Sequence, residues 1–265
     1  MIKAARVREI NALLDKAGVV SIADLARRFG ASPVTIRRDL LGLERDGYLL
    51  RTHGGATVVA PNGQYEPPPY AIRESEHAAE KNAIAAKAAE YVRDGDTLLL
   101  NAGTSANALA AELTRRRDLQ VVTNGLTVAV ALAAAPGAQV FMIGGAIDFK
   151  KLGAVGPQAE EAMQDIRVEK AFLGMAGVSI EHGLFMHSAA EARINRRFVA
   201  SAREVTLLVD SSKFNMPSPF RVASLREIHR IVTDARIRPE IREALQRMDL
   251  ELVVADSLPG ARIPG

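Results

Sequence analysis

Residues 21–45 read SIADLARRFGASPVTIRRDLLGLER, a stretch with two short helical patterns separated by a tight turn. Ser21 is followed three residues later by an aspartate, which is a typical N-cap pair, and Gly30 ends the first helix. Ser32 and Pro33 predict the start of the second helix, because serine caps a helix and proline fits its first position. This arrangement predicts a helix-turn-helix.

The second of these helices has two different faces. Ile36, Leu40 and Leu43 fall within one stripe at about 100° per residue and are predicted to be buried. The opposite side carries arginine, threonine and small apolar residues, which suit the major groove of DNA. The alternative is a solvated helix with incidental arginines, but an exposed Val34 and Leu41 argue against it.

A hairpin is predicted after this helix, with strands over residues 48–50 and 56–59 and a Gly-Gly turn between them. Such a wing would bring basic side chains to the phosphate backbone or the minor groove. A further helix is predicted before the helix-turn-helix, over residues 3–17. The predicted DNA-binding residues of the helix and wing are Ser32, Val34, Thr35, Arg37, Arg38, Arg45, Arg51 and His53.

The charge is unevenly distributed along the 265 residues. Residues 1–57 hold ten Lys and Arg against six Asp and Glu, whereas the rest of the chain holds 24 against 25. A basic module attached to a neutral domain is typical of proteins that bind a polyanion. The chain has no cysteine, no signal-peptide pattern and no apolar run long enough for a membrane helix, so we expect a cytoplasmic protein that does not contact membranes.

A proline-rich break separates this basic region from a longer domain. We predict a DNA-binding domain over residues 1–60, a linker over residues 61–74 and an effector-binding and oligomerisation domain over residues 75–265. An Ala-rich helix is predicted over residues 75–93. Short apolar strands then alternate with helical stretches, which predicts an α/β fold with a largely parallel sheet. The strands are expected at residues 97–100, 120–123, 139–143, 170–173, 205–209, 230–233 and 250–254.

Small and polar residues follow several of these strands. Ligands of parallel sheets bind beyond the carboxyl ends of the strands, and a helix N-terminus with hydroxyl groups favours an anion. We therefore predict a phosphate site there, with simple helix capping by Thr104 or Ser105 as the alternative. The predicted effector-binding residues are Asn101, Gly103, Thr104, Ser105, Thr123, Asn124, Gly144, Gly145, Asp210 and Lys213.

Residues 6–40 resemble the DNA-binding signature of the DeoR family of transcriptional regulators. The arginine at position 6 is followed at fixed spacing by the aliphatic residues Ile10 and Leu14. The motif Ser-x-x-Thr-Ile-Arg-Arg-Asp-Leu then stands at residues 32–40 without a departure. The resemblance implies that the chain binds double-stranded operator DNA and regulates transcription, with repression as the habit of the family.

The chain from about Glu80 to Phe214 is similar to the effector domain of the same family. This domain shares its fold with ribose-5-phosphate isomerase and glucosamine-6-phosphate deaminase, which implies a winged helix-turn-helix followed by a larger α/β sensor domain of that fold. It also implies a phosphorylated sugar as the effector. The motif Asp-Ser-Ser-Lys-Phe stands at residues 210–214, and the family's Glu-Ala pair at a helix start adds Glu191 to the effector site.

The chain departs from the family pattern at three positions. Asn101 stands where the first loop of the family has an aspartate, and Ser105 stands where it has a threonine. Asn195 stands where a lysine is common. These replacements bear on the identity of the sugar and leave the predicted fold unchanged.

Three functions agree with these observations. The leading hypothesis is a repressor of a carbohydrate-metabolism operon, without catalytic residues or cofactor, whose DNA affinity changes when a phosphorylated sugar binds. The second is a phosphosugar isomerase or deaminase with an accessory DNA-binding domain, in which Glu191 or Asp210 is the base. The third is a constitutive DNA-binding protein with a vestigial sensor.

Two further expectations concern metals and assembly. His182 and His187 lack metal-ligand spacing, so we expect no metal site. A single recognition helix on a small domain usually needs a symmetric partner, so we expect a homo-oligomer, either a dimer or a tetramer.

Overall fold

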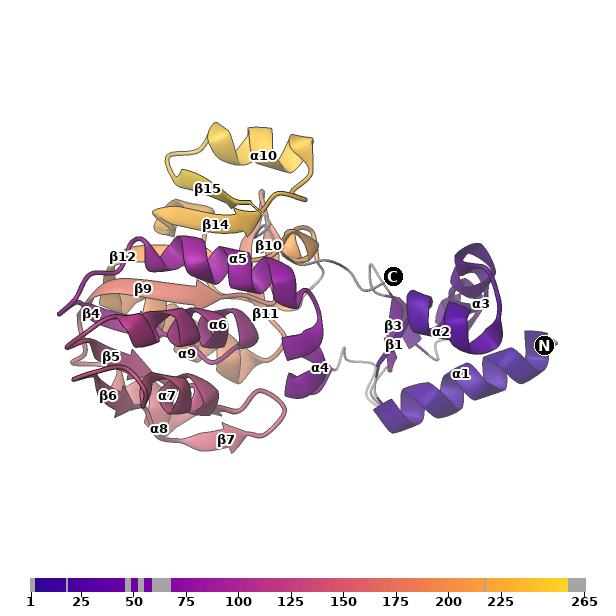
Figure 1. The fold of residues 1–265 in the computed structure, drawn as a ribbon, viewed down its shortest axis with the longest axis horizontal. Helices are drawn as coiled ribbons and strands as arrows, with labels where there is room; N and C mark the ends of the chain where they lie inside the picture. The colour runs from indigo at the N-terminus through magenta and orange to yellow at the C-terminus, as the bar shows by residue number, and fades with distance from the viewer. Residues whose placement is uncertain are drawn as a thin grey trace. The chain divides into compact units, whose positions relative to one another are not determined.

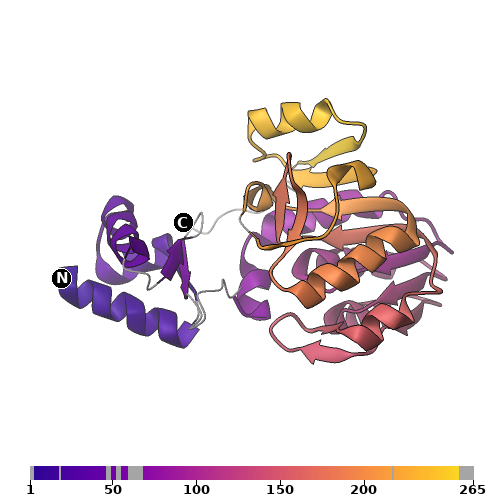
Figure 2. The ribbon, with the colours of Figure 1, turned by 180° about the vertical axis from the view of Figure 1, so that it is seen from behind.

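The structure is a computed structural model that describes residues 3–17, 19–45, 49–51, 55–58, 68–216 and 218–256. The chain divides into two compact units, Met1–Pro69 and Tyr70–Gly265. Figure 1 shows the ribbon, and Figure 2 shows it from behind. We call the units the N-terminal unit and the sensor unit.

The N-terminal unit contains the predicted helix-turn-helix and a small sheet. The hairpin strands lie within one residue of the predicted ranges, and a third strand, which the sequence did not indicate, joins them in the antiparallel order β1-β3-β2. Its elements are α1 (Lys3–Ala17), β1 (Val19–Ser21), α2 (Ile22–Phe29), α3 (Pro33–Arg45), β2 (Leu49–Arg51) and β3 (Gly55–Val58).

The predicted caps of the N-terminal unit are confirmed. The Ser21 side chain accepts a hydrogen bond from the backbone N–H of Asp24 at 3.0 Å, and Gly30 ends α2 with φ = 57°, a left-handed conformation that favours glycine. Ser32 accepts a hydrogen bond from the backbone N–H of Thr35 at 3.2 Å. The stripe of α3 that contains Ile36 is buried, as its spacing predicts.

The sensor unit is an α/β domain, as predicted. Its helices are α4 (Tyr70–Ser75), α5 (Ala78–Ala89), α6 (Thr104–Glu112), α7 (Leu126–Leu132), α8 (Pro157–Ala162), α9 (Ala189–Ser201) and α10 (Pro239–Gln246). Its strands are β4 (Thr97–Leu100), β5 (Gln120–Thr123), β6 (Gln139–Met142), β7 (Ala146–Asp148), β8 (Gly153–Val155), β9 (Val168–Gly174), β10 (Gly177–Ser179), β11 (Gly183–Met186), β12 (Ala202–Leu208), β13 (Phe220–Arg221), β14 (Arg230–Asp234) and β15 (Glu251–Ala255). Short 3-10 helices lie at Leu113–Arg115, Ser211–Lys213 and Leu225–Glu227.

All seven predicted strands form one parallel sheet, in the order β15-β14-β12-β9-β4-β5-β6. Helices α5, α6 and α7 cover one face, and α8 and α9 cover the other (Figures 1 and 2), each over its own apolar core. The order of the strands along the chain reverses between β4 and β9. In such sheets the crevice at the reversal, beyond the carboxyl ends of the two strands, is where ligands bind.

The helix predicted over residues 75–93 is present but shorter than predicted, because α5 spans Ala78–Ala89 and a separate short helix, α4, precedes it. The chain forms α4 and α5, with a turn between them at His77, whose φ is 52°. The buried Lys81 donates hydrogen bonds from Nζ to the backbone carbonyls of Arg73 and Glu76. These bonds satisfy carbonyl groups that the end of a helix leaves without partners, so the turn is stabilised by a side chain further along the chain.

Two small antiparallel sheets were not predicted. The hairpin β7–β8 and the sheet β10-β11-β13 lie outside the main sheet. Their strands are only two to four residues long, so they give little periodicity. Within the described residues, no helix is long and apolar enough to cross a membrane.

Candidate functional site

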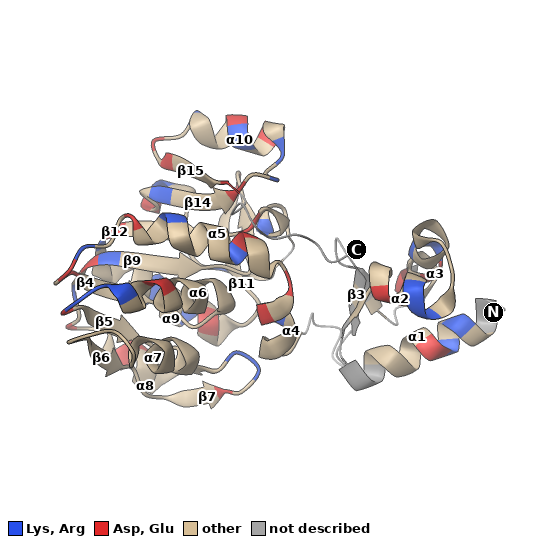
Figure 3. Ribbon diagram, in the orientation of Figure 1, with Lys and Arg blue, Asp and Glu red and all other residues tan. Residues whose placement is uncertain are grey.

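Helix α3 presents a mixed basic and apolar surface to solvent. Val34 is 62% exposed and Leu41 is 39% exposed, while Arg37 and Arg38 are also exposed. Figure 3 shows basic residues on this helix in blue. Exposed aliphatic side chains beside arginines suit contacts with thymine methyl groups and guanine edges in the major groove.

The other predicted DNA-binding residues fall into two groups. Ser32 and Thr35 lie at the start of α3, where their hydroxyl oxygens are 2.9 Å apart. The side chains of Arg45 and Arg51 and the whole of His53 lie outside the described residues. The roles of all five stay predictions.

Two residues of the predicted DNA-binding signature form a buried ion pair instead of facing solvent. The Nε of Arg6 on α1 lies 2.5 Å from the Oδ2 of Asp39 on α3, and both side chains are at most 10% exposed. The pair joins the first helix of the unit to the recognition helix. Its role in the signature is therefore to position α3.

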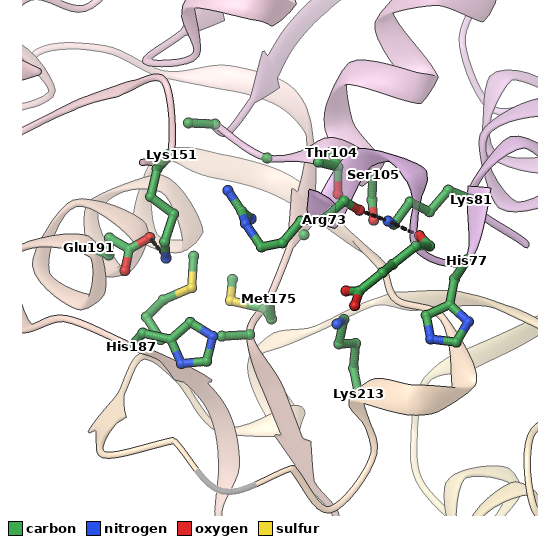
Figure 4. A pocket seen from close by; sticks show the side chains of 16 residues that line it. Arg73, His77, Lys81, Thr104, Ser105, Lys151, Met175, His187, Glu191 and Lys213 are labelled. Carbon is green, nitrogen blue, oxygen red and sulfur yellow. Dashed lines mark hydrogen bonds and ion pairs between the residues drawn. The ribbon is translucent and has the colours of Figure 1, made fainter. Parts of the chain in front are cut away.

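A pocket lies beyond the carboxyl ends of β4 and β9, where the strand order reverses (Figure 4). Five predicted effector residues line it: Gly103, Thr104, Ser105, Glu191 and Lys213. The sequence did not indicate the other lining residues. They include Arg73, Glu76, His77, Lys81, Lys151, Met175, Met186 and His187.

One wall of the pocket is the N-terminus of α6. The helix begins at Thr104 after the N-cap Gly103, and no side chain caps it. Simple capping by Thr104 or Ser105, which the sequence left open, is therefore not what the structure shows. The first N–H groups of α6 and the positive end of the helix dipole are available to an anion.

Four cationic side chains complete the pocket. In Figure 4, Arg73 and Lys213 reach into it, and Lys151 and Lys81 lie on opposite sides of it. Two carboxylates, Glu76 and Glu191, also line the pocket and balance two of these charges, and the Oε1 of Glu191 lies 2.5 Å from the Nζ of Lys151. The remaining excess of positive charge favours a negatively charged ligand.

Burial makes the charged forms of several pocket groups costly. It lowers the pKa of Lys81 to about 8, and it lowers the pKa of Lys151 although Glu191 opposes the shift. Burial also lowers the pKa of His187 well below its usual value, and Lys151 and Lys213 lower it further. An anion in the pocket would favour the protonated forms of all these groups.

We expect the unfolding free energy of the sensor unit to rise between about pH 8 and pH 10.5 because of Lys81. Its pKa is lowered from 10.5 to about 8 in the folded state, so the unfolded chain binds more protons in that window. Below the window both states hold the proton and this contribution is constant. Urea unfolding across the window should give a steeper rise for the natural protein than for Lys81→Met. If the unfolding free energy rose equally with pH in the two proteins, the pKa of Lys81 would not be lowered in the folded state.

The other predicted effector residues do not line the pocket. Asn101 donates to the carbonyl of Gly174 at 2.8 Å and accepts from its N–H at 2.9 Å, so it joins the ends of β4 and β9. Asn124 accepts from the N–H of Ala102 at 2.8 Å and donates to the carbonyl of Ala154 at 2.8 Å. Both amides hold in place the loops that build the pocket.

Thr123, Gly144 and Gly145 also lie outside the pocket lining. Thr123 accepts a hydrogen bond from the N–H of Gly125 at 3.0 Å. Gly145 has φ = 143°, and a Cβ there would lie 2.8 Å from the carbonyl oxygen of Val155, so the close approach of the chains needs glycine. These residues shape the loops after β5 and β6.

Asp210 lies beneath the pocket. It accepts a hydrogen bond from the N–H of Ser212 at 3.0 Å and begins the short helix that carries Lys213. Burial raises the pKa of Asp210, but Lys213, the hydrogen bond from Ser212 and two further cations outweigh it, so the pKa lies below its usual value. The carboxylate therefore stays charged and attracts the cations around the pocket.

Two departures from the family pattern contact each other. The Nδ2 of Asn101 donates to the Oδ1 of Asn195 on α9 at 2.7 Å, and both side chains are buried. An aspartate and a lysine at these positions would form an ion pair, so this chain has a neutral hydrogen bond in its place. The two replacements compensate each other in charge.

The sequence carried a weak signal for one of the missed residues. Lys81 lies three residues before Ile84 on the apolar face of α5, and a lysine on a buried face needs a partner. Arg73 comes from the region predicted as linker. Lys151 comes from the hairpin β7–β8, and its position depends on contacts with Glu191, 40 residues away.

Comparison with known proteins agrees with both units. Residues 6–62 match the model of the DeoR-like helix-turn-helix domain, and residues 76–235 match that of the DeoR C terminal sensor domain. Ribose 5-phosphate isomerase A from Methanocaldococcus jannaschii overlaps 53% of this chain and 55% of its own, with a TM-score of 0.37 and 17% identity. That overlap is too loose to carry any argument.

Two relatives match along nearly the whole chain. The putative aga operon transcriptional repressor of Escherichia coli O157:H7 is 31% identical, covering 94% of this chain and 93% of its own. The glycerol-3-phosphate regulon repressor of Escherichia coli K12 is 30% identical, covering 91% and 94%. The chain belongs to the DeoR family of helix-turn-helix transcriptional regulators.

Proposed function

We propose that this protein is an operator-binding repressor whose affinity for DNA is controlled by a phosphorylated sugar. The observation that carries the proposal is the pocket at the end of β4, where an uncapped helix N-terminus and four cationic side chains surround one space. A phosphate dianion satisfies both features, because it accepts N–H hydrogen bonds and neutralises the excess charge.

The relatives support this function. Their names describe repressors of an aga operon and of a glycerol-3-phosphate regulon. We therefore infer that this chain regulates carbohydrate genes. We assign a separate role to each part of the chain. Residues 1–60 bind DNA, residues 61–74 link, and residues 75–265 bind the effector and oligomerise, while α4 adds Arg73 to the effector pocket.

An isomerase or deaminase remains the rival function, and its two proposed bases are both engaged. Glu191 pairs with Lys151 and accepts hydrogen bonds from Ser188, and Asp210 is buried outside the pocket lining. A base must reach the proton that it removes. We therefore expect binding of phosphosugars without turnover. Conversion of any bound phosphosugar, followed by chromatography, would favour the enzyme.

A single titration tests the proposed function. A DNA site is first selected from random duplexes with the full-length protein, and its affinity is then measured by fluorescence anisotropy with a panel of phosphosugars and matched free sugars. We expect one phosphosugar to change the DNA affinity at least tenfold and its free sugar to have no effect. A sensor that ignores every phosphosugar would support the constitutive alternative.

Replacing Arg38 with alanine is expected to weaken binding to the selected site by about 1–3 kcal/mol if the side chain reads a guanine. A phosphate contact would instead weaken binding to all sequences and reduce the salt slope by about one. Anisotropy titrations at several salt concentrations distinguish these results. Arg242→Ala, an exposed arginine on α10, is the control. Unchanged DNA affinity of folded Arg38→Ala protein would exclude α3 as the reading helix.

A further inference from the structure

A buried primary amine lines the pocket of the sensor unit. Lys151 is 8% exposed, and its Nζ lies 2.5 Å from the Oε1 of Glu191, which is also buried. Figure 4 shows this ion pair on one side of the pocket, with Lys81 on the opposite side. The phosphate site proposed at the N-terminus of α6 uses Thr104 and its neighbours, so it does not account for the pair.

The other cations of the pocket differ from Lys151. Arg73 carries a guanidinium, which stays protonated and is not a nucleophile. The Nζ of Lys81 donates hydrogen bonds to the carbonyls of Arg73 and Glu76, so it is held by the turn between α4 and α5. Lys213 is partly exposed to solvent. Among the described lysines that line the pocket, Lys151 combines burial with direct contact to a carboxylate.

The surroundings of Lys151 favour its neutral amine. Burial lowers the pKa of Lys151, and the guanidinium of Arg73 lowers it further, although Glu191 opposes both effects. The buried methionines Met175 and Met186 add apolar surface to the same pocket. Desolvation and a second cation are the two conditions under which proteins activate a lysine to attack a carbonyl carbon.

We propose that Lys151 forms a reversible imine with the carbonyl carbon of an open-chain phosphosugar in the pocket, and that Glu191 moves the proton. The inference rests on the proposed function, since the phosphate loop Gly103–Ser105 would hold the ligand whose carbonyl meets the amine. An aldose or ketose phosphate carries both groups. The effector would therefore be recognised at two ends, by its phosphate at the start of α6 and by its carbonyl at Lys151.

The step balances without another reactant. Glu191 accepts a proton from the ammonium of Lys151, and the free amine adds to the carbonyl carbon to give a carbinolamine. Glu191 then returns the proton to the carbinolamine hydroxyl, which leaves as water while the C=N bond forms. The product is a protonated imine paired with the Glu191 carboxylate. No carbon–carbon or carbon–hydrogen bond breaks, so the step agrees with binding without turnover.

Reductive trapping of the full-length protein tests the proposal. Sodium cyanoborohydride reduces a protonated imine to a stable amine, which peptide mass spectrometry locates. The probes are ribose 5-phosphate and erythrose 4-phosphate, whose ring cannot close because O4 carries the phosphate. Their reduced forms, ribitol 5-phosphate and erythritol 4-phosphate, have no carbonyl and are the matched controls. We expect the aldehyde phosphates to label Lys151 at least about ten times as much as the exposed Lys150, because a held carbonyl reacts at a high effective concentration.

Three substitutions separate an imine from a simple ion pair. Lys151→Arg keeps the charge opposite Glu191 but has no primary amine, so the label should be lost and the affinity for an aldehyde phosphate should fall to that for its reduced form. Lys150→Arg is the matched control and should be labelled like the natural protein. Glu191→Gln removes the proton acceptor and should slow labelling at neutral pH at least about tenfold. If Lys151→Arg does not fold, the probes on the natural protein still decide the proposal.

Equal labelling of Lys151 and Lys150 by both aldehyde phosphates would overturn the imine, and an unchanged rate in Glu191→Gln would overturn the role of Glu191. Calorimetry with the same probes distinguishes this failure from a failure of the proposed function. Binding of a phosphosugar without labelling of Lys151 would contradict the imine and leave the phosphate pocket standing. If free erythrose labelled Lys151 as efficiently as erythrose 4-phosphate, the phosphate site and the proposed function would be overturned, while the imine itself would be confirmed.

Discussion

Replacing Asp39 with alanine is expected to destabilise the N-terminal unit by about 3 kcal/mol, because it leaves the guanidinium of Arg6 buried without its partner. A unit of this size has a total stability of only about 3–5 kcal/mol, so most of it would be lost. DNA binding should disappear, although Asp39 itself does not face DNA. Hydrogen exchange of the full-length protein should show unprotected amides in α1, α2 and α3 and normal protection in the sensor unit.

The structure offers a matched control for this prediction. Glu9 on α1 and Arg28 on α2 also form an ion pair between helices, at 3.0 Å, but both side chains are at least 40% exposed. Exposed pairs contribute about 1 kcal/mol or less, so Glu9→Ala should leave exchange and DNA affinity nearly unchanged. Equal effects of Glu9→Ala and Asp39→Ala would show that burial of the Arg6–Asp39 pair is unimportant.

Replacing Lys213 with alanine or Thr104 with valine is expected to weaken phosphosugar binding about tenfold or more. Hydrogen bonds to a charged group contribute roughly 1.5–3 kcal/mol each, and both side chains line the pocket beside the N-terminus of α6. The DNA affinity without effector should stay close to that of the natural protein. In a cell, such a variant would repress normally and fail to respond to its inducer.

Calorimetry of four proteins separates this role from a structural one. Thr104→Ser keeps the hydroxyl and should bind almost normally, and Lys87→Ala, on α5 in an exposed ion pair outside the pocket lining, should have no effect. If the free sugar bound as tightly as its phosphate, or if Lys213→Ala and Thr104→Val kept full affinity, the phosphate site would have to be assigned elsewhere.

The neutral pair Asn101–Asn195 is buried and bears on which residues of the pocket can contact the sugar. Asn101 bonds to Asn195 and to Gly174 at the end of β9, and Asn195 donates to the carbonyl of Glu191, so both amides are engaged within the protein. The hairpin β7–β8 and α9 instead bring together Lys151 and Glu191, a charged pair that lines the pocket. We therefore expect this ion pair, with Met175 and Met186 beside it, to select the sugar portion of the effector.

The sequence by itself determined the features that depend on neighbouring residues. Caps such as Ser21 and Ser32 act over three residues, so the helix-turn-helix could be predicted with its bounds. Each buried parallel strand is an apolar run, so all seven strands of the main sheet were predicted, with their ends moved by at most three residues. The loop Gly103–Ser105, which we propose holds a phosphate, follows the first of them, so its place at the end of the sheet could be predicted for the same reason.

Only the tertiary structure decided which side chains share the pocket. The turn between α4 and α5 depends on Lys81, whose burial no local pattern reveals, and this turn brings Arg73 and His77 to the end of β4. Lys151 meets Glu191 across 40 residues of sequence. Asn101 and Asp210, which were predicted to bind the effector, lie outside the pocket lining and form hydrogen bonds with loops. The position of a residue after a strand indicates the end of the sheet at which it lies, whereas the direction of its side chain depends on hydrogen bonds with segments far away in the sequence.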